Sequence, residues 1–135
     1  MTLFGSPVFY VFFIFILFAF KVPFALNLSL AIIFVELFCA VIKLVYHKER
    51  PNPQLKKNFY DKIDANSFPS VHSTRIALIV AMFCLYYKNP LIFIVGTIVV
   101  LGVGYSRIYL KRHYFLDVLA GFLIGITTAI IAFNI

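Results

Sequence analysis

The sequence predicts an all-α fold, a polytopic transmembrane helical bundle with about five spans. The first observation is composition: 63% of the 135 residues are hydrophobic and 13% are charged, which is far outside the range of soluble domains. The second is that five apolar segments each approach the roughly 20 residues that a helix needs to cross a bilayer. The third is that only one long polar stretch interrupts them. We expect one membrane-embedded domain over residues 1–135.

The predicted spans follow one another along the chain. They cover Leu3–Phe20, Phe24–Tyr46, Ser70–Tyr87, Pro90–Leu110 and Tyr114–Phe133. The first has no basic n-region and no small-residue cleavage site, so we interpret it as a retained span rather than a signal peptide. The breaks at residues 21–23 and 88–90 are short and predict tight hairpins. Residues 47–68 are polar and have no sustained apolar period, which indicates a loop, with a short interfacial helix as an alternative.

Basic residues and histidines gather at the span ends, although such residues are costly beside a bilayer core. In an antiparallel bundle, the end of the second span, the start of the third, the end of the fourth and the start of the fifth all lie at one membrane face. One polyanion bound by all these residues would explain their placement. The sequence therefore predicts an active site at one membrane face. Its residues are Lys43, Arg50, Ser70, Val71, His72, Arg107, His113 and Asp117.

Two imidazoles and a carboxylate in this set can carry phosphoryl chemistry. His113 and Asp117 are four residues apart at a helix start, hence on one face of that helix. A carboxylate there can accept the Nδ1 proton of the imidazole, which leaves Nε2 as a nucleophile toward phosphorus. His72 can protonate the leaving-group oxygen and then activate water for a second step. We predict that these three residues are catalytic.

The other members of the set are suited to binding phosphate. Lys43, Arg50 and Arg107 are expected to surround the phosphate oxygens and to stabilise charge in the transition state. Ser70 and Val71 open the third span, and a helix N-terminus presents free N–H donors and a partial positive charge. We expect no metal and no cofactor, because the cations take the place of a metal's charge.

Three motifs occur in order. They are Lys43-x6-Arg50-Pro51, Pro69-Ser70-x-His72 and Ser106-Arg107-x5-His113-x3-Asp117. Their order, spacing and position at helix ends resemble the signature motifs of the type 2 phosphatidic acid phosphatase (PAP2) family of integral membrane lipid phosphatases, over about residues 43–125. The resemblance implies a phosphohistidine on His113, an acid/base role for His72 and an orienting role for Asp117.

The chain departs from the family pattern in two ways. Family members commonly have six spans, whereas we count five. The commonest family pattern has Gly where this chain has Val71. Valine keeps the backbone N–H but resists positive φ, so anion binding survives if Val71 is helical or extended and weakens if a left-handed conformation is required.

We therefore expect a metal-independent lipid phosphatase that hydrolyses a phosphomonoester or a diphosphate. A polyprenyl diphosphate and a phosphatidate-like lipid are both compatible, with a weak preference for the first because the small loop leaves little room for glycan recognition. One alternative is a lipid phosphotransferase with an alcohol acceptor. Another is a non-catalytic membrane protein that binds lipid phosphates, but binding alone does not need an oriented pair of imidazoles.

The expected partners are the lipid phosphate and the surrounding membrane lipids, for a multi-pass protein of the cell membrane. Nucleic acid is not expected despite the net charge of +7, because the cations cluster in and around one loop. The distribution of lysine and arginine favours a cytoplasmic site, whereas many prokaryotic relatives face outward. The orientation and the oligomeric state stay open.

Further features lie outside the motifs. Glu36 and Arg75 are predicted to form an ion pair under the phosphate site, with a protonated Glu36 bonded to a backbone carbonyl as the alternative. Gly121 and Gly125 form a small-xxx-small pair that predicts close helix packing within the bundle. The loop lysines outside the motifs are expected to be solvated or to touch lipid headgroups: Lys48, Lys56, Lys57 and Lys62.

Overall fold

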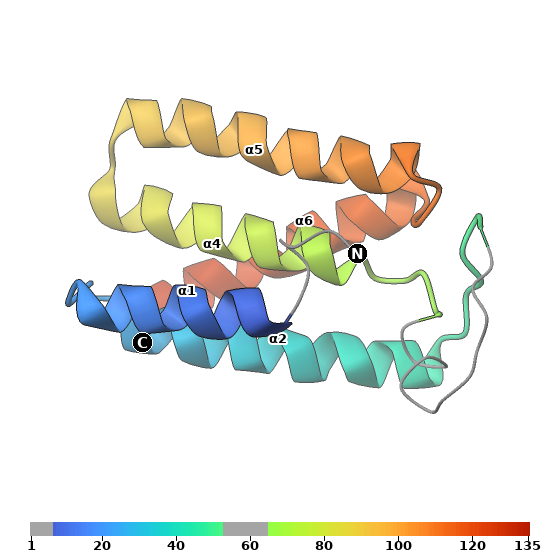
Figure 1. Ribbon diagram of the computed structural model, residues 1–135, viewed down its shortest axis with the longest axis horizontal. Coiled ribbons are helices and arrows are strands. Elements are labelled where there is room, and N and C mark those ends of the chain that lie inside the picture. Colours follow the sequence, from blue (N-terminus) through green and yellow to red (C-terminus); the bar gives the residue numbers. More distant parts are fainter. Residues whose placement is uncertain (1–6, 53–64) are drawn as a thin grey trace.

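In the computed structural model of the protein (Figure 1), the structure is described for residues 7–52 and 65–135. Within these ranges the chain forms five helices and no strand. The helices are α1 (Pro7–Ala19), α2 (Ala25–Val45), α4 (Val71–Tyr87), α5 (Pro90–Tyr109) and α6 (Phe115–Phe133). The predicted all-α bundle is confirmed, and the ends of the last four helices agree with the predicted spans to within one residue. Residues 3–6 of the first predicted span, and residues 53–64 of the predicted loop with Lys56, Lys57 and Lys62, lie outside the described residues.

The helices run along a common long axis (Figure 1). The described parts of the loop between α2 and α4 lie at one end of the bundle, together with the turn between α5 and α6. The α1–α2 and α4–α5 turns and the C-terminus lie at the other end. The four boundaries that carry the motifs therefore share one end, as the antiparallel arrangement requires.

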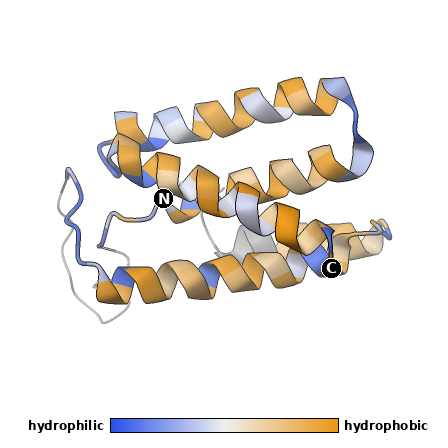
Figure 2. Cartoon of the chain, turned by 180° about the vertical axis from the view of Figure 1, so that it is seen from behind, coloured by the Kyte–Doolittle hydropathy of each residue, from blue (hydrophilic) through white to orange (hydrophobic). Residues whose placement is uncertain are grey.

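The helices have the length and surface of membrane spans. Three of them, α2, α5 and α6, are 21, 20 and 19 residues long and apolar enough to cross a membrane. The fourth, α4, is an apolar helix of 17 residues, at the short end of the range of roughly 17–25 for a span. On α5 only Gly96 and Gly104 are buried, so nearly all of its apolar side chains face outward, as they would toward lipid. Figure 2 shows the hydrophobic helix bodies and the hydrophilic turns at both ends. The chain is an integral membrane protein.

The turn between α4 and α5 shows how the sequence ends one helix and begins the next. Lys88 adopts a left-handed conformation (φ 48°, ψ 34°), and its N–H donates to the carbonyl of Cys84, which stops α4. The Asn89 side chain then accepts a hydrogen bond from the N–H of Leu91 at 2.8 Å, and Pro90 occupies the first helical position of α5. A side-chain cap followed by proline is a strong start signal for a helix.

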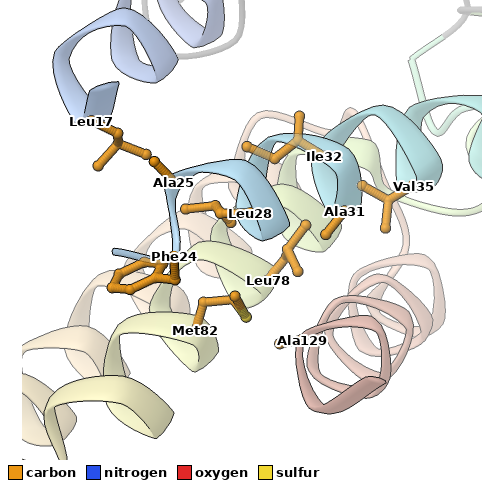
Figure 3. Packing of buried hydrophobic residues seen from close by; sticks show 10 residues of the cluster. All are labelled: Leu17, Phe24, Ala25, Leu28, Ala31, Ile32, Val35, Leu78, Met82 and Ala129. Atoms are coloured by element: carbon orange, nitrogen blue, oxygen red, sulfur yellow. The ribbon is translucent and has the colours of Figure 1, made fainter. Parts of the chain in front are cut away.

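The hydrophobic core lies between α2, α4 and α6, with one contribution from α1 (Figure 3). Leu28 and Val35 of α2 and Leu78 of α4 are fully buried, and Met82 of α4 is 1% exposed. The facing residue on α6 is Ala129, which is also fully buried. Because the lipid around the bundle is as apolar as the core, close van der Waals packing rather than removal from water holds such helices together.

The contact between α4 and α6 is close because α6 presents glycine there. A Cβ atom built on Gly121 would lie 2.7 Å from the backbone carbonyl oxygen of Ser70, and one on Gly125 would overlap the carbonyl oxygen of Thr74. Real Cβ atoms essentially never approach that closely. The predicted role of Gly121 and Gly125 in packing within the bundle is confirmed.

Gly125→Ala should destabilise the protein by about 1–3 kcal/mol, because the added methyl group forces the backbones of α4 and α6 apart. Thermal unfolding in detergent measures the change. Gly102→Ala is the matched control, since a Cβ at Gly102 meets nothing within 4 Å, and it should leave the midpoint unchanged or slightly higher. Equal midpoints for the two variants would contradict the packing argument.

Candidate active site

The starts of α4 and α6 are joined by a backbone hydrogen bond. The N–H of Ser70 donates to the carbonyl of Asp117 at 3.0 Å, and both residues are fully buried. The second and third sequence motifs therefore lie side by side, although 47 residues separate these two positions. Val71 and His72 are the first two residues of α4, so both lie at the same end of the bundle.

His113 lies in the turn before α6, and only 4% of it is exposed. Its Nδ1 atom lies 2.7 Å from the carbonyl oxygen of Ser67. A carbonyl can only accept, so Nδ1 carries the proton and Nε2 keeps its lone pair. The ring is thus held in the tautomer that a nucleophilic Nε2 requires.

The prediction that Asp117 accepts the Nδ1 proton of His113 is wrong, because Nδ1 is bonded to the Ser67 carbonyl instead. The two oxygens of the Asp117 carboxylate accept from other donors. Its Oδ1 accepts from the ammonium of Lys48 at 2.6 Å, and its Oδ2 accepts from the N–H of Tyr114 at 2.9 Å. Asp117 therefore caps the N-terminus of α6, where a negative charge is favourable. The expectation that Lys48 is solvated or bound to headgroups is also wrong, since it pairs with this buried carboxylate.

The surroundings of His113 keep its ring neutral. Burial, the charge of Arg50 and, to a smaller extent, the charge of Lys43 lower the pKa of His113 from 6.5 to about 4. The hydrogen bond to the Ser67 carbonyl and the charge of Asp117 raise the pKa, but together they do not offset this lowering. Burial and nearby cations both disfavour the charged form of an imidazole, so at neutral pH the ring is uncharged and Nε2 keeps its lone pair.

The cations of the first motif are buried beside this ring. Lys43, in the last turn of α2, is 3% exposed, and Arg50 is 8% exposed. The Asn66 side chain donates to the carbonyl of Lys43 at 2.6 Å, and Asn66 also pairs with Glu49 in an isolated antiparallel bridge. The two described parts of the loop are therefore fastened to each other and to the end of α2.

Arg107 lies in the last turn of α5 and is half-buried. Its carbonyl accepts hydrogen bonds from the N–H groups of Arg112 at 3.1 Å and His113 at 3.3 Å. These bonds close the turn that carries the chain from α5 to α6. They hold the backbone of His113 next to the last turn of α5.

Val71 is helical, as the first residue of α4. Among the described residues other than glycine, positive φ occurs only at Lys21, Lys88 and Lys111. The backbone at the start of α4 therefore does not use the left-handed conformation that valine resists. Its helical conformation is compatible with anion binding by the N–H groups there.

The sequence matches the PAP2 superfamily over residues 24–135. The chain belongs to this superfamily. Its fold is similar to the crystal structure of Aquifex aeolicus LpxE, with a TM-score of 0.79 and 26% sequence identity over 97% of this chain and 79% of that chain. It is also similar to a transmembrane PAP2 type phosphatidylglycerolphosphate phosphatase from Bacillus subtilis, with a TM-score of 0.75 and 25% identity over 96% of this chain and 70% of that chain. The chain therefore has the fold of a PAP2-type membrane lipid phosphatase.

An ion pair lies below the PAP2 motifs, inside the membrane-spanning region. The Nε atom of Arg75 on α4 donates to Oε1 of Glu36 on α2, so the predicted pair is confirmed. Arg75 is one turn below His72, and Glu36 is two turns below Lys43. The pair ties together the two helices that carry these residues.

Three residues outside the PAP2 motifs hold the site and were missed by the sequence prediction. Ser67 acts through its backbone carbonyl, which no sequence pattern reveals. Asn66 lies in the loop without a motif of its own, and Lys48 was grouped with the solvated lysines. Within residues 7–52 and 65–135, no group of three or more His, Cys, Asp or Glu side chains is arranged to hold a metal ion.

Replacing either Glu36 or Arg75 by a neutral residue should destabilise the bundle, because it removes one charge of the pair and leaves the other in an apolar region. Glu36→Gln and Arg75→Gln are expected to show a coupling of about 1–3 kcal/mol in a double-mutant cycle of thermal stability. Additive effects of the two changes would show that the pair does not join α2 to α4.

The pKa of His113 predicts a distinct NMR titration. With [13Cε1]-histidine labelling there are only three signals, because the chain has three histidines. The His113 signal in the ligand-free protein should stay unchanged from pH 8 down to about pH 5 and titrate near pH 4. His113→Asn assigns the signal by removing it. A midpoint at or above about 6, close to an unperturbed imidazole, would contradict the buried cationic environment.

Proposed function

We propose that this protein is a metal-independent lipid phosphatase that hydrolyses a phosphomonoester or diphosphate through a phosphohistidine on His113. The observation that carries the proposal is the state of this ring: it is buried and neutral, with Nδ1 bound to a carbonyl and two buried cations beside it. The cations are Lys43 and Arg50. A neutral nucleophile surrounded by positive charge is suited to attack an anionic phosphorus centre.

In the first step the Nε2 lone pair of His113 forms a bond to phosphorus. The bond between phosphorus and the lipid oxygen breaks, and its electron pair stays on that oxygen. The protonated imidazole of His72 donates its proton there. In the second step a water molecule gives a proton to His72, its oxygen binds phosphorus, and the bond to Nε2 breaks. Phosphate leaves, and both rings return to their starting states.

The remaining site residues bind and position. Lys43, Arg50 and Arg107 offset the charge that spreads over the phosphoryl oxygens in the transition state. The N–H groups at the start of α4, near Ser70 and Val71, add donors with the partial positive charge of a helix N-terminus. Asp117 acts by shaping the start of α6 next to His113, not by touching the ring.

A groove between α4, α5 and α6 supports a lipid as the substrate. Its volume is about 390 Å³ and its walls are almost entirely apolar, running from Ala77 to Leu85 on α4 and from Phe93 to Leu101 on α5. It begins about 9 Å below the start of α4, since six residues separate Val71 from Ala77. The hydrocarbon chain of a lipid whose phosphate is bound at the site is within reach of this groove.

Both a polyprenyl diphosphate and a phosphatidate-like lipid have such a hydrocarbon chain, and the Bacillus subtilis neighbour is named for a lipid phosphate. We propose that residues 1–135 form one membrane-embedded domain of a multi-pass enzyme of the cell membrane.

Phosphate release from a panel of lipid phosphates in detergent micelles tests the proposal. The purified protein should release inorganic phosphate from at least one of them, and EDTA should not change the rate. Loss of activity in EDTA that Mg²⁺ restores would overturn metal independence. Transfer of the phosphoryl group to an added alcohol in place of water would instead identify a phosphotransferase.

Substituting His113 and substituting His72 should impair different steps of the reaction. His113→Ala is expected to abolish both turnover and covalent labelling, because the nucleophile is gone. His72→Ala should slow breakdown of the intermediate, so that a ³²P-labelled substrate with a good leaving group leaves label on the protein. The label should be acid-labile and alkali-stable, as expected of a phosphoramidate. Labelled His113→Ala protein would exclude His113 as the nucleophile.

A further inference from the structure

Lys48 lies between Lys43 and Arg50 of the first motif, but it contacts the machinery around His113. Its Nζ atom lies 2.6 Å from Oδ1 of Asp117 and 4.6 Å from the centre of the Tyr114 ring, a distance at which a cation is attracted to the ring face. The Lys48 side chain is 28% exposed, whereas that of Asp117 is fully buried. The partly exposed ammonium therefore covers the buried carboxylate.

The backbone of Lys48 makes a second contact with the same site. Its carbonyl accepts a hydrogen bond from the N–H of Ser67 at 2.7 Å, and the Ser67 carbonyl in turn accepts from His113 Nδ1 at 2.7 Å. The chain continues from His113 to Tyr114, whose N–H donates to Asp117 at 2.9 Å. Asp117 then returns to Lys48 through the ion pair. The contacts form a closed ring that runs through the loop, the α5–α6 turn and the first turn of α6.

We propose that Lys48 is a positioning residue for His113, which fixes the ring of this histidine by closing the circuit of contacts and by neutralising Asp117. The proposal rests on the proposed function, in which His113 is the nucleophile. Lys48 does not touch the reacting phosphate. It acts through Ser67, which holds Nδ1, and through Asp117, which fixes the backbone next to His113.

The charge of Lys48 affects the protonation of His113, because several charged and polar groups surround that ring. Arg50 and Lys43 approach the ring from the first motif, the Ser67 carbonyl from the loop, and Asp117 from α6. With Lys48 in place, the negative charge of Asp117 is balanced by its own partner. Without Lys48, that buried charge is balanced only by the surrounding site, and protonation of His113 becomes more favourable. A protonated ring has no lone pair for attack.

Lys48→Met removes the ion pair to Asp117, which opens the circuit and leaves the Asp117 charge unbalanced, while the backbone bond to Ser67 stays. Lys111→Met is the control. Lys111 is an exposed lysine in the α5–α6 turn, so its removal takes the same charge from the same end of the bundle. For Lys48→Met, kcat on phosphatidic acid in detergent micelles should fall about 10–100-fold with little change in KM, the size of effect that follows when a reacting group is misplaced. The His113 midpoint in the ligand-free NMR titration should rise by about one pH unit or more. Lys111→Met should change neither.

Further variants separate positioning from plain structural support. Lys48→Arg keeps the charge and should retain most of the activity. The double variant Lys48→Met/Asp117→Asn removes the unbalanced carboxylate, so the His113 midpoint should return toward the wild-type value. If Lys48→Met does not fold, Lys48→Gln, which keeps a donor without the charge, provides the same titration.

The outcomes decide between the roles. An unchanged His113 midpoint together with an unchanged kcat would overturn the proposal. So would a loss of thermal stability with no movement of the midpoint, because that would make Lys48 a structural residue only. A shifted midpoint in a protein that shows no phosphatase activity would support the contact to His113 and refute the proposed function instead.

Discussion

The close approach of α4 and α6 is the constraint on which the site depends. It is possible because Gly121 and Gly125 place no side chain between the two backbones. One turn before Gly121, near the start of α6, the same approach lets the N–H of Ser70 reach the carbonyl of Asp117. That bond holds two helix starts in register, and the histidines of the second and third motifs lie one or two residues from the starts of these helices. A larger residue at either glycine would push α4 and α6 apart and so separate the second and third motifs, without changing any side chain of the motifs themselves.

A second constraint is the accumulation of positive charge around a neutral imidazole. Lys43 and Arg50 are both buried, and concentrating like charges in a region of low dielectric is unfavourable for the empty protein. An anion bound among them removes that repulsion. The arrangement therefore favours binding of an anion, and burial together with the same charges keeps the His113 ring neutral. The positive charge at the site and the neutral state of the His113 ring therefore both depend on the same buried cations, Lys43 and Arg50.

Several polar groups inside the membrane-spanning part find partners within the protein, because lipid offers none. The hydroxyls of Ser29, Thr97 and Thr128 each donate to the carbonyl four residues earlier in their own helix, at 2.7–2.8 Å. Glu36 and Arg75 satisfy each other between α2 and α4. The hydroxyl bonds are local and serve one helix each. The ion pair joins two helices, and these two helices carry Lys43 and His72.

The sequence by itself determined the bundle, the helix ends and the gathering of the motifs at one face, because span length and antiparallel alternation leave little freedom. It predicted the Glu36–Arg75 pair but left a protonated Glu36 bonded to a backbone carbonyl as an equal alternative, and the tertiary structure decided for the pair. Only the tertiary structure decided which group holds His113. Spacing along α6 favoured Asp117, but that carboxylate caps its own helix and pairs with Lys48, while a carbonyl of Ser67 accepts the proton of the ring. A backbone carbonyl has no sequence signature, and the partner of Lys48 depends on how the loop folds back over α6. Local periodicity cannot specify such a contact, because it joins residues 69 positions apart.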